Sequence, residues 1–175
     1  EEDMFAPVLA STRRRALWLG INLATAFLAS WVIGQFEETL SKVVALAVLM
    51  PIVASMGGIA GSQTLTLAIR GIALGQLSAG NARALLFKEL AVGTLNSLIW
   101  AAVVAAIAGV WFNSSGIAIL IAIALTINMV FAAIAGSLLP LLLQRIGIDP
   151  ALASGAFVTT VTDVVGFFAF LGLAA

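Results

Sequence analysis

One short segment near the C-terminus combines an acidic side chain with several hydroxyl groups inside an apolar run. Residues 155–166 hold Asp163, preceded by Thr159, Thr160 and Thr162. A carboxylate at membrane depth costs about 2.5–3.5 kcal/mol on insertion scales, so it usually faces a partner, a water-filled cavity or an ion. Carboxylate, hydroxyl and carbonyl oxygens are hard ligands that suit magnesium, calcium or manganese better than zinc or copper. The segment therefore predicts a divalent-cation site on an aqueous path through a membrane.

Two other roles for Asp163 stay open from the residues alone. Its carboxylate could accept hydrogen bonds from neighbouring hydroxyls, such as those of Thr66 or Ser62, and serve only helix packing. A proton-coupled carrier would also use a lone buried aspartate. In a dimer, two copies of Asp163 held close together would repel each other unless a cation compensated them, and a divalent ion is the natural compensator.

The residue inventory argues against catalysis. The chain has no histidine and no cysteine, which removes serine–histidine chemistry, thiolates and cysteine-type zinc sites. An intramembrane aspartyl protease needs two aspartates on different spans, and we expect Asp163 to be the one acidic residue at depth. The net charge of zero gives no support for a nucleic-acid partner. We therefore expect a protein that is not an enzyme and does not bind nucleic acid.

The composition is that of an integral membrane protein. Of the 175 residues, 62% are hydrophobic and only 9% are charged, with a mean hydropathy of +1.18. A soluble domain of this length could not cover its surface with so few charges. Several apolar runs are near or above the roughly 20 residues that cross a bilayer as a helix. We predict an all-α polytopic fold with five transmembrane helices, from the runs 16–34, 43–69, 90–112, 117–143 and 151–175.

The second apolar run is interrupted. It contains Pro51, which removes a helical hydrogen bond, and three glycines within five positions. Such interruptions survive at membrane depth where the freed backbone groups meet protein, water or an ion. Glycine-rich helix packing is the alternative. Because polar residues accompany the glycines, we favour a broken helix that lines a cavity, through Pro51, Ser55, Ser62, Gln63 and Thr64.

The connections between the runs are short and polar. Residues 35–42 are predicted as a turn, and residues 70–88 as a loop with a short amphipathic start to the next helix. Asp149 and Pro150 are typical of an N-cap followed by a first-turn proline. Within the fourth run, Asn128 is expected to hydrogen-bond between helices rather than bind a ligand.

The basic residues are divided unequally between the two ends of the predicted spans. Seven lie at the end that holds the N-terminus, and only Lys42 lies at the other. This asymmetry places the N-terminus in the cytoplasm and the C-terminus outside the cell membrane. Residues 1–15 are predicted as a cytoplasmic, basic juxtamembrane linker and residues 16–175 as the membrane domain. Five spans are too few for a complete pore, so we expect a homodimer. The seven are Arg13, Arg14, Arg15, Arg70, Arg83, Lys88 and Arg145.

Several of these segments together resemble the transmembrane domain of the MgtE family of magnesium channels. The resemblance is carried by residues 55–63 (SMGGIAGSQ), Phe36 with Glu37, residues 148–151 (IDPA), and residues 159–163 (TTVTD) with Gly166. The motifs follow one another in the family's order and spacing, and the resemblance covers nearly the whole chain from about Arg13 onward.

This resemblance implies a homodimer of five-helix subunits whose second and fifth helices line one pore on the two-fold axis. Asp163 matches the aspartate that selects hydrated Mg²⁺, and backbone carbonyls near Thr159 and Thr160 are the expected helpers. Family members usually carry a cytoplasmic N domain and paired CBS domains that sense magnesium. Those domains are absent here, so we expect a truncated protein or a naturally short homologue. The pore-lining residues implied are Pro51, Ser55, Gly57, Gly58, Ile59, Gly61, Ser62, Thr162 and Gly166.

Two positions depart from the family pattern. Ile59 stands where the family's glycine motif commonly has asparagine, and Ala156 stands where a proline often precedes the last turn of the filter. Replacing a polar amide by a branched hydrocarbon could narrow or dry the path, which leaves Ca²⁺ or Mn²⁺ open beside Mg²⁺. The alternative function is a secondary transporter for divalent cations, coupled to sodium or protons.

Overall fold

The computed structural model describes residues 7–175, and among these it contains helices and no strands. Five of the helices are long and apolar enough to cross a membrane, which confirms the predicted all-α, five-span fold. A sixth helix, α2, has only six residues. The helices are α1 (Val8–Gly34), α2 (Glu37–Lys42), α3 (Val44–Ala73), α4 (Ala82–Phe112), α5 (Ser115–Arg145) and α6 (Pro150–Ala174).

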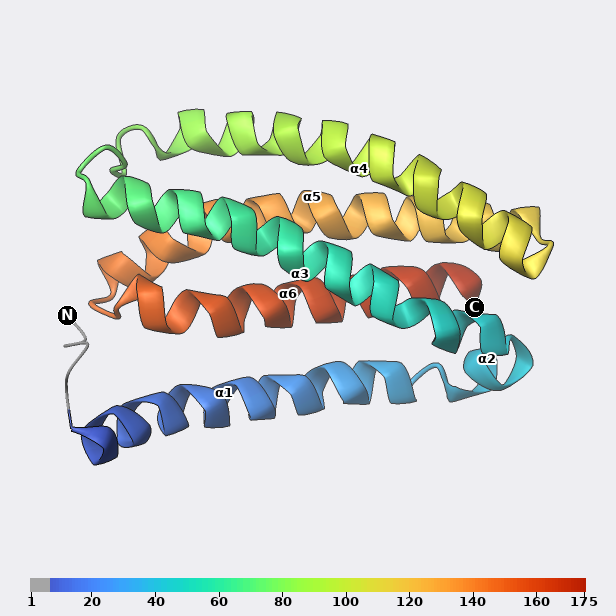
Figure 1. Ribbon diagram of the computed structural model, residues 1–175, viewed down its shortest axis with the longest axis horizontal. Coiled ribbons are helices and arrows are strands. Elements are labelled where there is room, and N and C mark those ends of the chain that lie inside the picture. The colour runs from blue at the N-terminus through green and yellow to red at the C-terminus, as the bar shows by residue number, and fades with distance from the viewer. Residues whose placement is uncertain (1–6) are drawn as a thin grey trace.

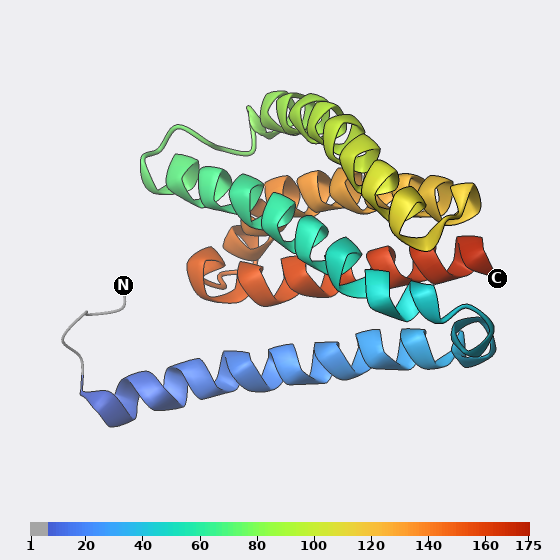
Figure 2. The same cartoon turned by 45° about the vertical axis from the view of Figure 1, so that its right-hand side comes forward.

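The long helices lie side by side along the long axis of the molecule, and α5 lies at the centre of the bundle, in contact with α3, α4 and α6 (Figure 1). Helix α5 packs against α3, α4 and α6, and α3 also packs against α6. Helix α1 packs mainly against α6 and lies apart from the other long helices in both ribbon views (Figure 2). The bundle therefore consists of a packed group, α3 to α6, with α1 laid along one side of it.

The largest core cluster lies toward the end of the bundle that holds α2. There, Leu46, Leu49 and Val53 of α3 pack with Ile121 of α5 and Phe170 of α6. All five side chains are essentially inaccessible. Burial of large side chains of this kind stabilises a helix interface chiefly by close packing. This cluster holds the N-terminal half of α3 against α6. These two helices carry the polar motifs.

The helix boundaries correct several predictions. Helix α1 begins at Val8, not near residue 16, so Arg13, Arg14 and Arg15 lie on its first two turns and not in a linker. Residues 1–6 of the predicted linker lie outside the described residues. The expected loop at 70–88 is much shorter, because α3 continues to Ala73 and α4 begins at Ala82. In both places polar or charged residues continue a helix beyond its apolar run, which hydropathy alone does not detect.

Helix α3 is continuous, so the prediction of a broken second helix is wrong. It extends over 30 residues through Pro51 and all three glycines of the motif. Its glycines instead allow neighbouring helices to approach closely. A Cβ at Gly57 would clash with the amide of Asn128, and one at Gly61 would lie 2.5 Å from Val158 Cγ1. Small residues that admit a neighbouring helix are a usual means of packing in membranes.

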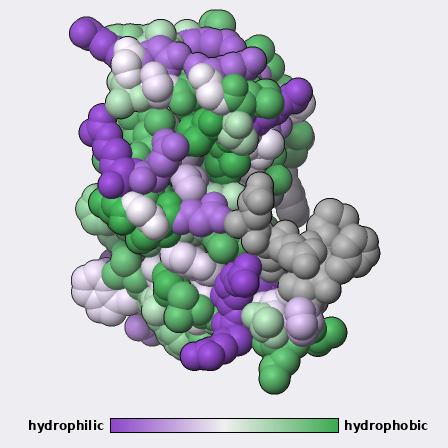
Figure 3. Space-filling model, turned by 90° about the vertical axis from the view of Figure 1, so that its left-hand side faces the viewer, coloured by the Kyte–Doolittle hydropathy of each residue, from purple (hydrophilic) through white to green (hydrophobic). Residues whose placement is uncertain are grey.

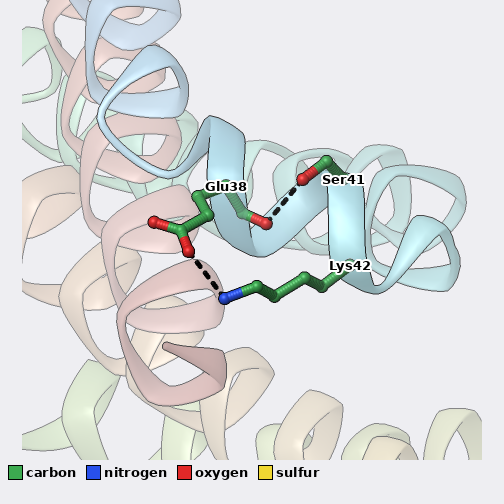
Figure 4. A network of polar contacts seen from close by, with 3 residues as sticks. All are labelled: Glu38, Ser41 and Lys42. Atoms are coloured by element: carbon green, nitrogen blue, oxygen red, sulfur yellow. Dashed lines mark hydrogen bonds and ion pairs between the residues drawn. The ribbon is translucent and has the colours of Figure 1, made fainter.

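The short connections are tied by local hydrogen bonds. Residues 35–42 contain the single-turn helix α2 where a turn was predicted, with Lys42 paired to Glu38 at 2.6 Å (Figure 4). In the α3–α4 connection, Asn81 Oδ1 accepts from the amide of Ser78 at 2.8 Å. At the start of α6, Asp149 Oδ1 accepts from the amide of Ala151 at 2.9 Å, which confirms the predicted N-cap.

Candidate cation site

Helix α6 places Asp163 near the middle of a membrane-spanning segment. The helix has 25 residues, opens with the Asp149 cap and Pro150, and contains no other acidic or basic residue within its bounds. The Asp163 side chain is half-buried in the single subunit. Among residues 7–175 it takes part in no hydrogen bond or ion pair. The carboxylate is thus held at depth by packing alone, without a protein counter-charge.

The close approach of α3 to α6 fixes the level of Asp163. Gly61 meets Val158, and a Cβ at Gly166 would lie 3.2 Å from Val53 Cγ1. From one contact to the other, α3 advances eight residues while α6 goes back eight, so the two helices run antiparallel in a constant register. Interpolating between these contacts puts Asp163 level with the turn of α3 that holds Ser55.

One face of α3 beside this contact is polar and uncovered. Pro51, Ser55, Ser62 and Thr66 are exposed and recur at intervals of four, seven and four residues, which places them on one side of a helix. Gly58, half-buried, lies on the same side. Thr66 Oγ1 donates to Ser62 O at 2.8 Å, so this hydroxyl does not reach Asp163. The role of Asp163 as a carboxylate satisfied by Thr66 or Ser62 is therefore not seen in the described residues.

The threonine hydroxyls before Asp163 bond to their own helix. Thr160 Oγ1 donates to Ala156 O at 2.7 Å, and Thr162 Oγ1 donates to Thr159 O at 3.0 Å. In an α-helix Thr159 O also accepts from the amide of Asp163, four residues on. A carbonyl oxygen has two lone pairs, so that of Thr159 has none free in this arrangement. The Thr160 carbonyl has no such second donor among the described residues.

The remaining residues of the predicted pore lining separate into two groups. Gly57, Gly61, Thr162 and Gly166 are buried inside the subunit, and the glycines contact Asn128 or Val158 rather than an open surface. Ile59 is exposed at the edge of the same side, four residues after Ser55, and it also lines a cavity between α3 and α4. A single subunit therefore brings Asp163 together with Pro51, Ser55, Gly58 and Ser62 as an open surface, and with Thr159 and Thr160 along α6.

Asn128 joins the three helices around this site. As predicted from the sequence, it hydrogen-bonds between helices: its Nδ2 donates to Val53 O at 2.9 Å. Its side chain is fully buried between Gly57 and Gly166, and its Oδ1 has no partner among the described residues. Because Gly57 and Gly166 both contact one amide, α3 and α6 are positioned by the same residue of α5.

One functional candidate was missed by reasoning from the sequence. Glu89, which directly follows the predicted loop of residues 70–88, lies on α4, is only 7% exposed, and accepts a hydrogen bond from Thr64 Oγ1 at 2.9 Å. A second acidic side chain is therefore buried by the protein within a helix that is long and apolar enough to span a membrane, about two turns from the start of that helix. Glu89 stands directly before the apolar run that begins at residue 90, and this position made it resemble the end of a loop.

No group of three or more acidic, histidine or cysteine side chains occurs among the described residues. A cation bound by the described part of one copy of this chain would therefore meet at most two such side chains. Magnesium accepts such a sparse ligand set because it loses its hydration waters reluctantly and is commonly held through one or two carboxylates. A small number of carboxylates is thus compatible with binding of a hydrated ion.

The sequence was compared with protein families and with curated proteins. The profile of the MgtE family, described as "Divalent cation transporter", matches residues 50–173. A "Magnesium transporter MgtE" of Bacillus subtilis is 29% identical over 92% of this chain, and one of Thermus thermophilus is 34% identical over 91%. A third, from Enterococcus faecalis, is 28% identical over 99%. The chain spans only 35% to 38% of the length of these relatives.

Proposed function

The chain belongs to the MgtE family of divalent cation transporters, and on that basis we propose that it forms a path for hydrated Mg²⁺ with Asp163 as the selecting residue. One observation carries the proposal: Asp163 lies near the middle of the candidate span α6, half-buried and without a partner among residues 7–175, beside the uncovered face of α3 that holds Ser55 and Ser62. A charge at such depth is unfavourable unless water or an ion compensates it. The magnesium transporters to which the chain is similar support Mg²⁺ as the ion.

The path is completed by a second copy of the chain. One subunit supplies a wall made of α3 and α6, with Asp163 at its middle and Pro51, Ser55, Gly58 and Ser62 along α3. A two-fold dimer would place an identical wall opposite and two carboxylates across a shared axis. Two carboxylates placed close together across that axis repel each other, and a divalent cation bound between them compensates both charges.

The ion retains much of its water in this proposal. Two carboxylates cannot fill an octahedral shell, so selection acts on the hydrated ion through Asp163 and through carbonyls near Thr160. The carbonyl of Thr159 joins them only when the Thr162 hydroxyl turns away from it. Ca²⁺ and Mn²⁺ also accept oxygen ligands and are the ions against which Mg²⁺ preference is to be measured.

The orientation proposed for the chain in the membrane rests on the distribution of its basic residues. Helix ends that bear Arg13, Arg70, Arg83 and Arg145 lie together at one end of the bundle, which Figure 3 views directly with its hydrophilic patches. The opposite end holds α2 with Lys42. We place the basic end in the cytoplasm and the C-terminus outside.

A secondary transporter is the second candidate. The chain carries two acidic side chains inside its membrane-spanning helices, Asp163 and Glu89, and carriers coupled to sodium or protons use such groups. The two mechanisms differ in their currents. A channel gives a current that reverses at the Mg²⁺ equilibrium potential, whereas coupling shifts the reversal potential with the sodium or proton gradient. Both candidates are transport functions, and neither uses the chain as an enzyme.

The test is Mg²⁺ flux into liposomes that contain the purified protein. We expect Asp163→Asn, which keeps the side-chain shape and removes the charge, to lower the flux at least about tenfold, equivalent to about 1.4 kcal/mol. Glu38→Gln is the matched control, because Glu38 is an exposed carboxylate on α2 outside the proposed path. Light scattering should give the mass of two chains for all three proteins. Wild-type flux in a folded Asp163→Asn dimer would refute the role of Asp163, and a monomeric wild type would refute the shared path.

A further inference from the structure

A second polar site lies on the other side of α3 from Asp163. A cavity of about 540 Å³ opens between α3 and α4, with α5 at its back. Most of its wall is apolar, including Met56, Ile59 and Trp100. Four polar side chains interrupt this wall, two of them amides: Gln63, Thr64, Glu89 and Asn96.

Glu89 is the charged group of this cavity, and it has no counter-charge. The side chain is 93% buried by the protein, since 7% remains exposed. Thr64 Oγ1 donates to its Oε2 at 2.9 Å, whereas its Oε1 receives no hydrogen bond from any residue between 7 and 175. No lysine or arginine among those residues forms an ion pair with it. An unpaired charge inside a membrane-spanning helix is costly unless an ion, a proton or water compensates it.

The dimensions of the cavity favour a hydrated ion. Six waters at about 30 Å³ each occupy about 180 Å³, so a divalent ion with its full first shell fits beside Glu89. One carboxylate and two amides are too few to replace that shell. They can accept or donate hydrogen bonds to its waters, as Gln63 and Asn96 have both donors and acceptors.

We propose that the cavity lined by Glu89, Thr64, Gln63 and Asn96 binds one hydrated divalent cation per chain, separately from the Asp163 path. Glu89 lies two turns from the start of α4, about 10 Å along the helix, toward the end of the bundle that carries most basic residues. Bound there, the cation bridges α3 and α4, which otherwise have few contacts with each other.

Separation from the Asp163 path follows from the helix faces. On α3, Ile59, Gln63 and Thr64 line the cavity, whereas Ser55 and Ser62 do not. The buried side of α3 between these residues is closed by packing against α5 and α6 through Gly57 and Gly61. Helix α6, which carries Asp163, contributes no residue to the cavity lining, so each carboxylate can be removed without the other.

The test uses Mn²⁺, whose electron paramagnetic resonance signal changes when the ion binds. In lipid nanodiscs, the Asp163→Asn protein should still bind one Mn²⁺ per chain. Adding Glu89→Gln, whose amide oxygen can still accept from Thr64, should weaken that binding at least tenfold. Glu38→Gln in the same background is the control for loss of a carboxylate, and it should leave the Mn²⁺ titration unchanged.

Identical Mn²⁺ titrations with and without Glu89→Gln would overturn the proposal, and would mean that Glu89 only packs against its neighbours. Asn96→Leu is the second variant, because its position is exposed to the cavity and does not carry Glu89's hydrogen bond. Asn96→Leu should weaken Mn²⁺ binding several-fold. If Glu89→Gln fails to fold, unchanged Mn²⁺ binding by Asn96→Leu would contradict the proposed site. Because the titrations are made in the Asp163→Asn background, loss of flux through Asp163 does not affect their outcome.

Discussion

At the scale of single residues, the threonine hydroxyls that precede Asp163 are hydrogen-bonded to backbone carbonyls of α6, the kind of group that the proposed cation site would use. The Thr162 hydroxyl donates to Thr159 O at 3.0 Å and so occupies a lone pair that a bound cation or its water would otherwise use. Thr162 is fully buried, so turning its hydroxyl away from Thr159 O would not bring it into contact with solvent. The Thr159 carbonyl, which the proposed path would place near the ion, is thus already bonded to a neighbouring side chain on the same helix.

Substituting Thr162 by valine tests this competition. Valine has the shape of threonine without the hydroxyl, so Thr162→Val frees a lone pair on Thr159 O and leaves no cavity. A hydrogen bond contributes about 0.5–1.5 kcal/mol. We therefore expect a roughly 2- to 10-fold lower Mg²⁺ concentration at half-maximal flux.

Thr162→Ser is the control, because it keeps the hydroxyl and should keep the wild-type value. If the two variants give the same half-maximal concentration, the Thr159 carbonyl takes no part in binding the ion.

At the scale of elements, the glycines of α3 differ in what they contact. A Cβ at Gly57 would clash with the buried amide of Asn128, which itself donates to Val53 O. A Cβ at Gly58, one residue later, would have nothing within 4 Å. The two positions share a helix, a depth and a residue type, and differ only in their neighbour.

This difference predicts opposite effects on stability. Gly57→Ala should destabilise the protein by about 1–3 kcal/mol, because overpacking forces Asn128 or the backbone to move. Gly58→Ala should be neutral, or stabilising by up to about 1 kcal/mol, because alanine favours helix. Unfolding of both variants in detergent, followed by loss of helical circular dichroism, measures the effect. Equal stability of the two would mean that the α3–α5 contact is looser than described.

The same helix shows why prediction from sequence succeeded for the spans and failed for their details. Hydropathy reports transfer into lipid, so it located all five spans. It does not report backbone continuity, and Pro51 and the glycines suggested a break that packing against α5 and α6 makes unnecessary. The Asp149 cap was predictable because capping is local. The buried position of Glu89 was not predictable, because it depends on a contact with Thr64, which is 25 residues away in the sequence.

At the scale of the whole molecule, the charge distribution sets a direction. Seven of the eight basic residues lie at the end formed by the start of α1, the α3–α4 connection and the α5–α6 connection. Two exposed serines mark opposite ends: Ser41 on α2, with Lys42 beside it, and Ser78 in the α3–α4 connection. Because the chain has no cysteine, each serine can be made the sole thiol.

These serines allow the orientation to be tested in intact cells. A membrane-impermeant maleimide should label Ser41→Cys, and should label Ser78→Cys only after the cells are permeabilised, because positively charged connections are retained in the cytoplasm. The unsubstituted chain, which lacks thiols, is the background control. The reverse pattern would invert the topology and place Glu89 near the outer surface. Labelling of both serines in intact cells would contradict the five alternating spans, since an odd number of crossings separates Ser41 from Ser78.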